Sequence, residues 1–227
     1  MQKIIFYSLL FVASLLLSCC SDNDDAQAPD VPTYARGTFT DARDGNTYGY
    51  VTIGNLDWTT ENSRYDTGSD DTRILYSTEG TPGDDTNLND QKTLERYGYL
   101  YSWEGAQEAV PEGWRLPTDA DWQQLEEALG MSADEAQGDA WRGSYQGQLL
   151  ADTRTLGLGY GGFYDSNSTS YAIKFYFMQA MGYYWTATSP SDGVAYIRKI
   201  MYNNTKVYRH TSKTNNMMSV RFVRDHQ

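Results

Sequence analysis

Cysteine and histidine are almost absent from this chain, whose 227 residues include only two of each. Cys19 and Cys20 both lie near the N-terminus, so the remainder of the chain has neither disulfides nor thiol chemistry available. His226 lies next to the C-terminus, and His210 lies among polar residues in "YRHTSK", which favours a solvated side chain. Basic residues are also scarce. The net charge of −12 argues against a nucleic-acid partner and against direct docking on anionic lipid.

The common sequence motifs of enzymes are missing as well. No Walker A, G-x-S-x-G or H-E-x-x-H sequence occurs in the chain. "GLGYGG" (157–162) matches G-x-G-x-x-G by letter, but "FYDSNSTS" follows it where a helix would be needed to bind a pyrophosphate. We therefore predict no catalytic residue, no enzyme activity and no cofactor. A pair of glycosidase carboxylates has no such signature, so that alternative stays open.

The N-terminus predicts a lipid anchor. Lys3 precedes an apolar run from Ile4 to Leu17, which has the length of a signal-peptide core and is too short to span a bilayer. The run ends in "LLSCC", which resembles a bacterial lipobox with Cys19 as the lipidated residue. We predict a lipoprotein signal peptide over 1–18 and attachment to a membrane through acyl chains on Cys19. Ordinary secretory cleavage is the alternative.

A flexible tether is expected over 19–36. Its sequence "SDNDDAQAPDVPTYA" is acidic, contains proline and has few large apolar residues, so it cannot bury enough surface to fold. An acidic run directly after the cysteine is similar to the surface-export signals of Bacteroidetes lipoproteins. The expected location is the cell envelope, as an outer-membrane lipoprotein that is exposed at the cell surface.

The remaining residues, 37–227, predict a single α+β domain. "DGN" (44–46) between β-favouring residues indicates a hairpin, and "RILY" (73–76) is a short strand within long loops. Helices are expected over 97–109 and 118–129. In the second, Thr118 and Asp121 have capping-box spacing, and Trp122, Leu125 and Leu129 share one apolar face. Three strands are expected at the end of the chain, over 183–188, 194–202 and 219–225.

Five segments, in this order, resemble the Fibrobacter succinogenes major paralogous domain family. They are "DGNTYGYVTIGNLDWTTEN", "YGYLYSWEGA", "PEGWRLPTDADWQQL", "GYYWTATSPSDGVAYIR" and "SVRFVRD". The resemblance implies a C-type-lectin-like fold, related to the formylglycine-generating enzyme and sulfatase-modifying-factor group, with two helices on a small twisted antiparallel or mixed sheet and long loops. It implies no established activity.

Two activities known on that fold are excluded by the residues. A formylglycine-generating oxidase needs a reactive cysteine pair in the domain, and histidine-held iron needs more histidines than this chain has. The sugar-binding tripeptides of calcium-dependent C-type lectins are missing too. "DDTNLND" places Asp85, Asn87 and Asn89 at calcium-loop spacing, but Asp90 replaces the loop glycine and Arg96 the final acid. A solvated acidic loop is the better interpretation, so we predict no metal site.

A binding site remains the best functional hypothesis. Aromatic and polar residues gather between the second helix and the final strands, where flat rings beside amides and carboxylates suit sugars or a protein surface. The candidates are Tyr160, Phe163, Tyr164, Asp165, Asn167, Tyr171 and Tyr176. The tryptophans of the family-like segments are expected in the core: Trp58, Trp103, Trp114, Trp122 and Trp185.

The sequence thus predicts a lipid-anchored envelope module for binding or adhesion, with a glycan or a surface protein as its ligand. Two alternatives stay open, a polysaccharide hydrolase with an unrecognised carboxylate pair and a structural subunit of a surface assembly.

Overall fold

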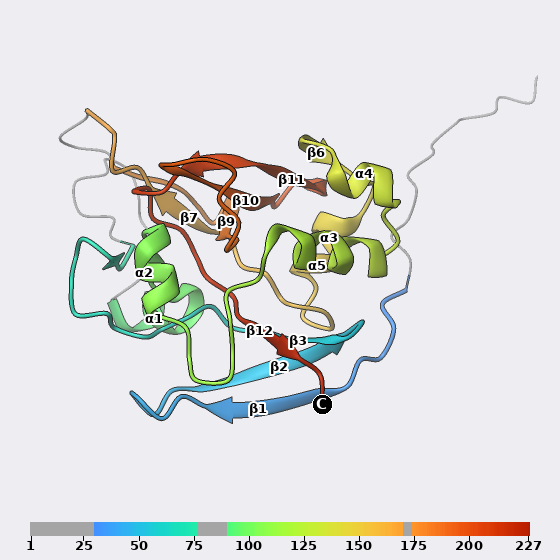
Figure 1. The fold of residues 1–227 in the computed structure, drawn as a ribbon, viewed down its shortest axis with the longest axis horizontal. Helices are drawn as coiled ribbons and strands as arrows, with labels where there is room; N and C mark the ends of the chain where they lie inside the picture. The colour runs from blue at the N-terminus through green and yellow to red at the C-terminus, as the bar shows by residue number, and fades with distance from the viewer. Residues whose placement is uncertain (1–29, 77–89, 170–173) are drawn as a thin grey trace, which may run out of the picture.

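The computed structural model describes residues 30–76, 90–169 and 174–227, and its fold class is α+β as predicted. Cys19, Tyr171 and the calcium candidates Asp85, Asn87 and Asn89 lie outside the described residues. The described part holds five helices rather than two, together with strands in three sheets (Figure 1). No helix in that part is both long enough and apolar enough to cross a membrane.

A four-stranded antiparallel sheet joins the two ends of the domain. Its order is β1 (Arg36–Thr40), β2 (Thr47–Ile53), β3 (Leu56–Thr59) and β12 (Val223–Asp225). The predicted hairpin is confirmed between β1 and β2, where Gly45 adopts a φ of +76° that few other residues tolerate. The C-terminal strand pairs with β3, so it forms the edge opposite β1.

A six-stranded sheet forms the other half of the domain. Its order is β6 (Ala140–Arg142), β11 (Asn204–Lys213), β10 (Val194–Met201), β9 (Met181–Trp185), β7 (Gly161–Tyr164) and β8 (Phe175–Met178). All neighbours are antiparallel except β7 and β9. Strands were expected at β9 and β10, no strand was predicted at β11, and β12 is shorter than the expected strand over 219–225.

The first predicted helix is only half right. The chain instead forms α1 (Asp90–Tyr97), a two-stranded pairing of β5 (Leu100–Tyr101) with β4 (Arg73–Ile74), and then α2 (Trp103–Glu108). Gly98 separates α1 from β5 with a φ of +70°, and a Cβ there would lie 2.4 Å from the Ser63 carbonyl oxygen. Ser102 then caps α2 by accepting a hydrogen bond from the Gly105 amide.

The second predicted helix is confirmed as α3 (Asp119–Ala128), with the capping box of Thr118 and Asp121 present. Two short helices follow, α4 (Ala133–Gln137) and α5 (Gln146–Ala151). Figure 1 shows α3 and α5 together on one side of β10 and β11. Trp122 and Leu125 of α3 are buried in one apolar cluster between the two sheets.

Candidate functional site

Residues 111–130 include the "PEGWRLPTDADWQQL" segment of the resemblance described above. Several of their side chains make contacts that stabilise the fold. Trp114 is buried and stacks on Phe39 with ring centroids 4.3 Å apart, and Trp122 lies edge-on to Trp58 at 4.9 Å. The Arg115 guanidinium donates hydrogen bonds to both carboxylate oxygens of Asp121. These contacts assign the tryptophans, Arg115 and Asp121 of this segment to the structure of the fold.

Two acidic residues of α3 lie in a buried ion network. Glu126, which is fully buried, accepts from Arg198 Nε at 2.7 Å and from Arg142 Nη2 at 2.5 Å. Asp119 accepts from Arg198 Nη1 at 2.7 Å and from Arg209 Nη2 at 2.8 Å. We call these five residues the α3 ion network. Each charge in it has an oppositely charged partner, and Arg209 also pairs with Asp139, so the network holds α3 against the six-stranded sheet rather than serving a substrate.

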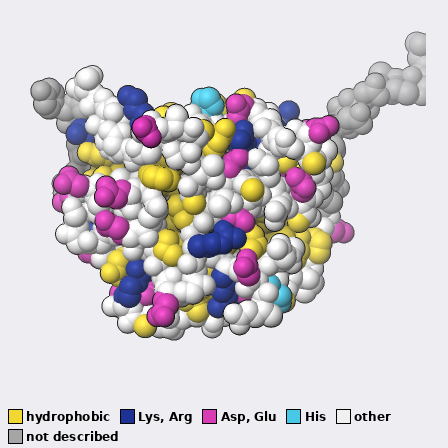
Figure 2. Space-filling view, viewed as in Figure 1, with side chains coloured by type: hydrophobic (Ala, Val, Ile, Leu, Met, Phe, Trp, Pro, Cys, Tyr) yellow, Lys and Arg dark blue, Asp and Glu magenta, His cyan; other side chains and the backbone are white. Residues whose placement is uncertain are grey.

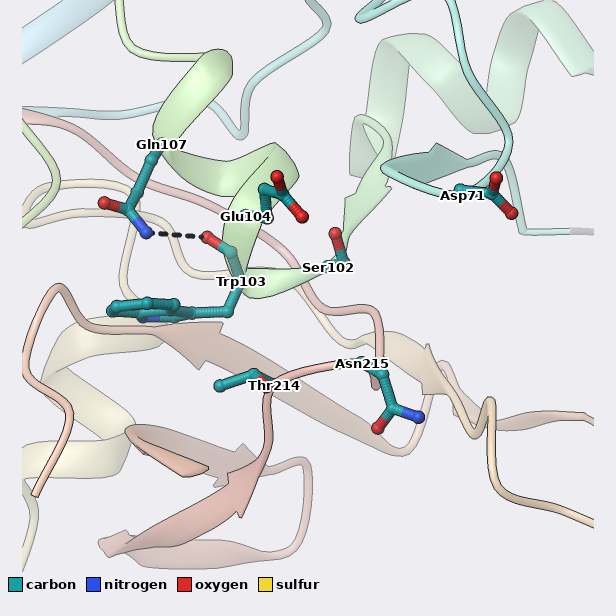
Figure 3. Close-up of a pocket in the computed structure, with 7 residues that line it drawn as sticks. All are labelled: Asp71, Ser102, Trp103, Glu104, Gln107, Thr214 and Asn215. Atoms are coloured by element: carbon teal, nitrogen blue, oxygen red, sulfur yellow. Dashed lines mark hydrogen bonds between the residues drawn. The ribbon is translucent and has the colours of Figure 1, made fainter. Parts of the chain in front are cut away.

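A concave site lies beside α2. It is a cavity of about 390 Å³ lined by residues from α2, from the turn before β4 and from the loop after β11 (Figure 3). The lining residues are Asp71, Ser102, Trp103, Glu104, Gln107, Thr214 and Asn215. We call this space the Trp103 cavity.

Trp103 supplies the apolar part of the cavity and differs from the sequence expectation. It was predicted in the core together with four other tryptophans, which are all buried, but its side chain is only partly buried. Its indole Nε1 donates to the Thr186 carbonyl at 2.8 Å, which fixes the ring orientation. Figure 3 shows the ring extending beneath α2, with Thr214 and Asn215 on the facing segment. A rigid aromatic face is therefore accessible beside polar groups.

The polar lining consists of two exposed carboxylates, amides and hydroxyls. Glu104 and Gln107 come from α2, and Asp71 comes from the turn that packs against that helix. The turn is held closely, because the Ser102 amide donates to the Thr72 carbonyl at 3.0 Å and a Cβ on Gly105 would lie 2.0 Å from that oxygen. A ring face surrounded by such donors and acceptors is suited to a polyhydroxylated ligand.

The predicted polar residues border this cavity without lining it. Asn167 Nδ2 donates to Asn215 Oδ1 at 3.1 Å, and Asn215 Nδ2 donates back to Asn167 Oδ1 at 3.1 Å. The side chain of Asp165 accepts a hydrogen bond from the backbone N–H of Asn167 at 2.9 Å, which stabilises the turn between these two residues. Asp165 and Asn167 therefore hold in place the loop that presents Asn215 to the cavity.

The predicted aromatic residues do not converge on one surface. Phe163 and Tyr176 stack on each other with centroids 5.5 Å apart, on β7 and β8. Tyr164 points to the other side of β7, where it meets Phe175 at 5.0 Å. Tyr160 is partly buried against the core cluster that contains Trp122. Burial raises the pKa of Tyr160, so its hydroxyl remains protonated at neutral pH.

Several cavity residues were missed by the sequence analysis. Glu104, Gln107 and Thr214 belong to no recognisable motif, and Asp71 lies more than 100 residues from Thr214 in the sequence. A usable signal existed only for Trp103, which follows the helix-capping Ser102 and precedes the charged Glu104.

No group of three or more His, Cys, Asp or Glu side chains able to hold a metal ion occurs within 30–76, 90–169 and 174–227. On the face drawn in Figure 2, acidic side chains are spread widely, with basic ones between them. This mixed surface agrees with the net charge of −12 and does not form a basic patch on that face.

The sequence profile of the Fibrobacter succinogenes major domain matches residues 51–224. This match covers more than half of the chain and includes the whole six-stranded sheet, α3 and all residues of the Trp103 cavity, whereas β1 precedes it. No curated protein and no solved structure shows significant similarity to the chain.

Proposed function

The chain belongs to the Fibrobacter succinogenes major domain family, and we propose that this member is an envelope-displayed module that binds a glycan in the Trp103 cavity. The observation that carries the proposal is the partly exposed indole of Trp103, held by its hydrogen bond to Thr186 and surrounded by carboxylate, amide and hydroxyl groups. Stacking of a sugar ring on the indole would bury its apolar C–H face, while the polar groups would bond its hydroxyls.

The proposed location follows from the N-terminal sequence. Acyl chains on Cys19 would hold the protein at the outer membrane, and the acidic segment over 19–36 would separate the domain from the lipid surface. Mass spectrometry of the membrane fraction tests this step. A diacyl-modified Cys19 supports it, and a mature chain that begins elsewhere without lipid contradicts it.

Binding is tested on a glycan array with the soluble chain from residue 20 onward. We expect specific binding to a set of related glycans, and Trp103→Leu should reduce it by about tenfold or more because the flat ring is lost. Glu104→Gln should also weaken binding, whereas Glu108→Gln is the matched control on the same helix because Glu108 does not line the cavity. Thermal unfolding of each variant shows whether the fold is retained.

No binding by the folded protein to any glycan on the array would contradict the proposal. Equal binding by Trp103→Leu and the wild type would contradict the assigned cavity. Either result is informative because both variants leave the α3 ion network unchanged.

A second function, polysaccharide hydrolysis, is favoured by one observation. Asp71 and Glu104 are two carboxylates in the same cavity, and glycosidases act through such a pair. Release of reducing ends from plant or mucin polysaccharides, abolished in Glu104→Gln, would identify the protein as a hydrolase. Binding without release of reducing ends identifies it as a binding module.

A further inference from the structure

The six-stranded sheet has two chemically different faces. On β10, the side chains of Arg198 and Ile200 point toward α3 and α5, so Lys199 between them points to the opposite face. The ladder pairs Lys199 with Tyr208 on one side and with Tyr183 on the other, and Tyr208 pairs further with Trp141. Residues directly opposite one another in a ladder lie on the same face.

Aromatic rings run across that face from strand to strand. Trp141 and Tyr208 have ring centroids 5.2 Å apart, and Tyr183 and Phe163 have centroids 4.7 Å apart. Lys199 lies between the two pairs. We call these five residues the aromatic row; Tyr183 in it is buried, and the other four are partly exposed. Five strands contribute to it, so with a strand spacing of about 4.8 Å it is roughly 19 Å long.

The ammonium of Lys199 is held by rings alone. Its Nζ lies 3.6 Å from the Tyr208 ring centroid and 5.5 Å from that of Tyr183. Within the described part of the chain it has no hydrogen bond and no ion pair, although its side chain is half-buried. Burial lowers the pKa of Lys199, which is the signature of a charge without an acidic neighbour.

The surrounding strands add the positive charge of Lys206 and no negative charge. None of the six strands contains Asp or Glu, although the chain as a whole has 30 acidic residues. Lys206 and His210 alternate with buried residues of β11 and are exposed on the same face as Tyr208. An anion that approaches the aromatic row therefore meets no carboxylate from these strands.

We infer that the aromatic row is a second binding surface, separate from the Trp103 cavity, and that it takes an acidic polysaccharide whose uronic-acid carboxylate pairs with Lys199. Neighbouring sugar rings lie over Trp141 on one side and Phe163 on the other. A linear chain of flat rings matches a linear row of aromatic rings, and one carboxylate supplies the hydrogen-bond acceptor that Lys199 lacks.

The recessed position of Lys199 distinguishes this ligand from a membrane. A flat lipid surface is contacted by protruding cations, whereas the Lys199 ammonium lies against the Tyr208 ring. A polysaccharide lying along the row can place a carboxylate directly above it.

The test uses polygalacturonate, its fully methyl-esterified form and vesicles that contain anionic phospholipid. We expect the soluble chain from residue 20 onward to bind polygalacturonate, with weaker binding as salt increases, and to bind the ester at least about tenfold more weakly. Lys199→Met should lose about tenfold in affinity for polygalacturonate and should bind the ester like the wild type. Lys199→Arg should keep most of the affinity for polygalacturonate.

Lys213→Met is the matched control. Lys213 is exposed on the same strand as Tyr208, but its position along β11 places it on the opposite face, so its loss should leave binding unchanged. If Lys199→Met does not fold, Lys199→Gln replaces it in the test, and the same loss of affinity for polygalacturonate is expected.

Three results would overturn the inference: no binding to polygalacturonate, equal affinity for acid and ester, or equal affinity of wild type and Lys199→Met. Binding to anionic vesicles that is stronger than binding to polygalacturonate would also overturn it and identify the surface as a lipid contact. Trp103→Leu should leave polygalacturonate binding intact, so failure at one surface is distinguishable from failure at the other.

Discussion

Arg198 and Lys199 are neighbours on β10, yet among the residues that the structure describes only the charge of Arg198 is paired with carboxylates of the same chain. Arg198 is fully buried, and its guanidinium bonds the carboxylates of Glu126 and Asp119 on α3. Lys199 points to the other face of the sheet and contacts two tyrosine rings. The difference indicates that charges used for folding receive their partners from the same chain, whereas Lys199 is positioned for a partner from outside.

The largest effect is expected inside the α3 ion network. Glu126→Gln keeps the size of the side chain but leaves Arg142 without its carboxylate and Arg198 with one instead of two. An uncompensated buried cation should cost about 3–5 kcal/mol of unfolding free energy. Urea denaturation measures this loss. The exposed neighbour Glu127→Gln is the control and should stay within about 0.5 kcal/mol of the wild type. If Glu126→Gln lowers the unfolding free energy by less than about 1 kcal/mol, the buried charges beside Arg198 would matter no more for stability than the unpaired charge of Lys199.

Asp119 tests the same network through pH. Burial acts to raise the pKa of Asp119, but hydrogen bonds and charge from Arg209 and Arg198 outweigh burial, so the pKa is lowered. A lowered carboxyl pKa stabilises the fold above the unfolded pKa of about 3.9, and this stabilisation is lost as pH falls through the folded pKa. Asp119→Asn should cost about 1.5–3 kcal/mol at neutral pH, since Arg198 and Arg209 each keep another carboxylate.

The cost of Asp119→Asn should shrink once the pH falls below about 4. Denaturation of both proteins across this range measures the difference directly. If Asp119→Asn lowers the unfolding free energy equally at neutral and acidic pH, the charge of Asp119 does not contribute to the stability of the fold.

A smaller effect is expected at the start of α3. Thr118→Ala removes the side-chain oxygen that accepts from the Asp121 amide at 3.1 Å, and it should cost about 1 kcal/mol. Thr118→Ser retains the hydroxyl and should remain within about 0.5 kcal/mol of the wild type. Equal stability of the alanine and serine variants would mean that the capping box adds nothing beyond the packing of α3.

The smallest effect on stability is expected at Lys199. Lys199→Met should leave the unfolding free energy unchanged or raise it by less than about 1 kcal/mol, because it removes a half-buried ammonium that has no acidic partner. The pKa of Lys199 is lowered, so the charged form disfavours the fold, and this effect disappears as pH rises toward about 10.4. The gain from methionine should therefore be present at neutral pH and vanish at high pH. A clear loss of stability would assign Lys199 to the structure of the fold.

The sequence predicted what is encoded locally. The capping box of Thr118 and Asp121, the apolar face with Trp122, and the turn at Gly45 depend on neighbours a few residues apart, and all are present. The α3 ion network was not predictable, because Arg198 lies 72 residues beyond Glu126. The sequence gives no sign of which distant arginine a carboxylate meets.

The same limit explains the missed strand β11. Its inward positions include Val207, which is apolar, and Arg209, which is buried and paired with Asp119 and Asp139. The alternation of polar and apolar residues is therefore hidden, so the sequence does not predict this strand. The Trp103 cavity was hidden in the same way, since its residues come from three separate segments.

The placement of β1 and β12 has a consequence for how this domain can be joined to other chains. The two strands are the edges of one four-stranded antiparallel sheet, so the start of β1 and the end of β12 leave the same end of that sheet (Figure 1). Three strand spacings separate them, about 14 Å. A short peptide could close that distance, which makes the domain suited to circular permutation and to insertion as a cassette within a loop of another protein.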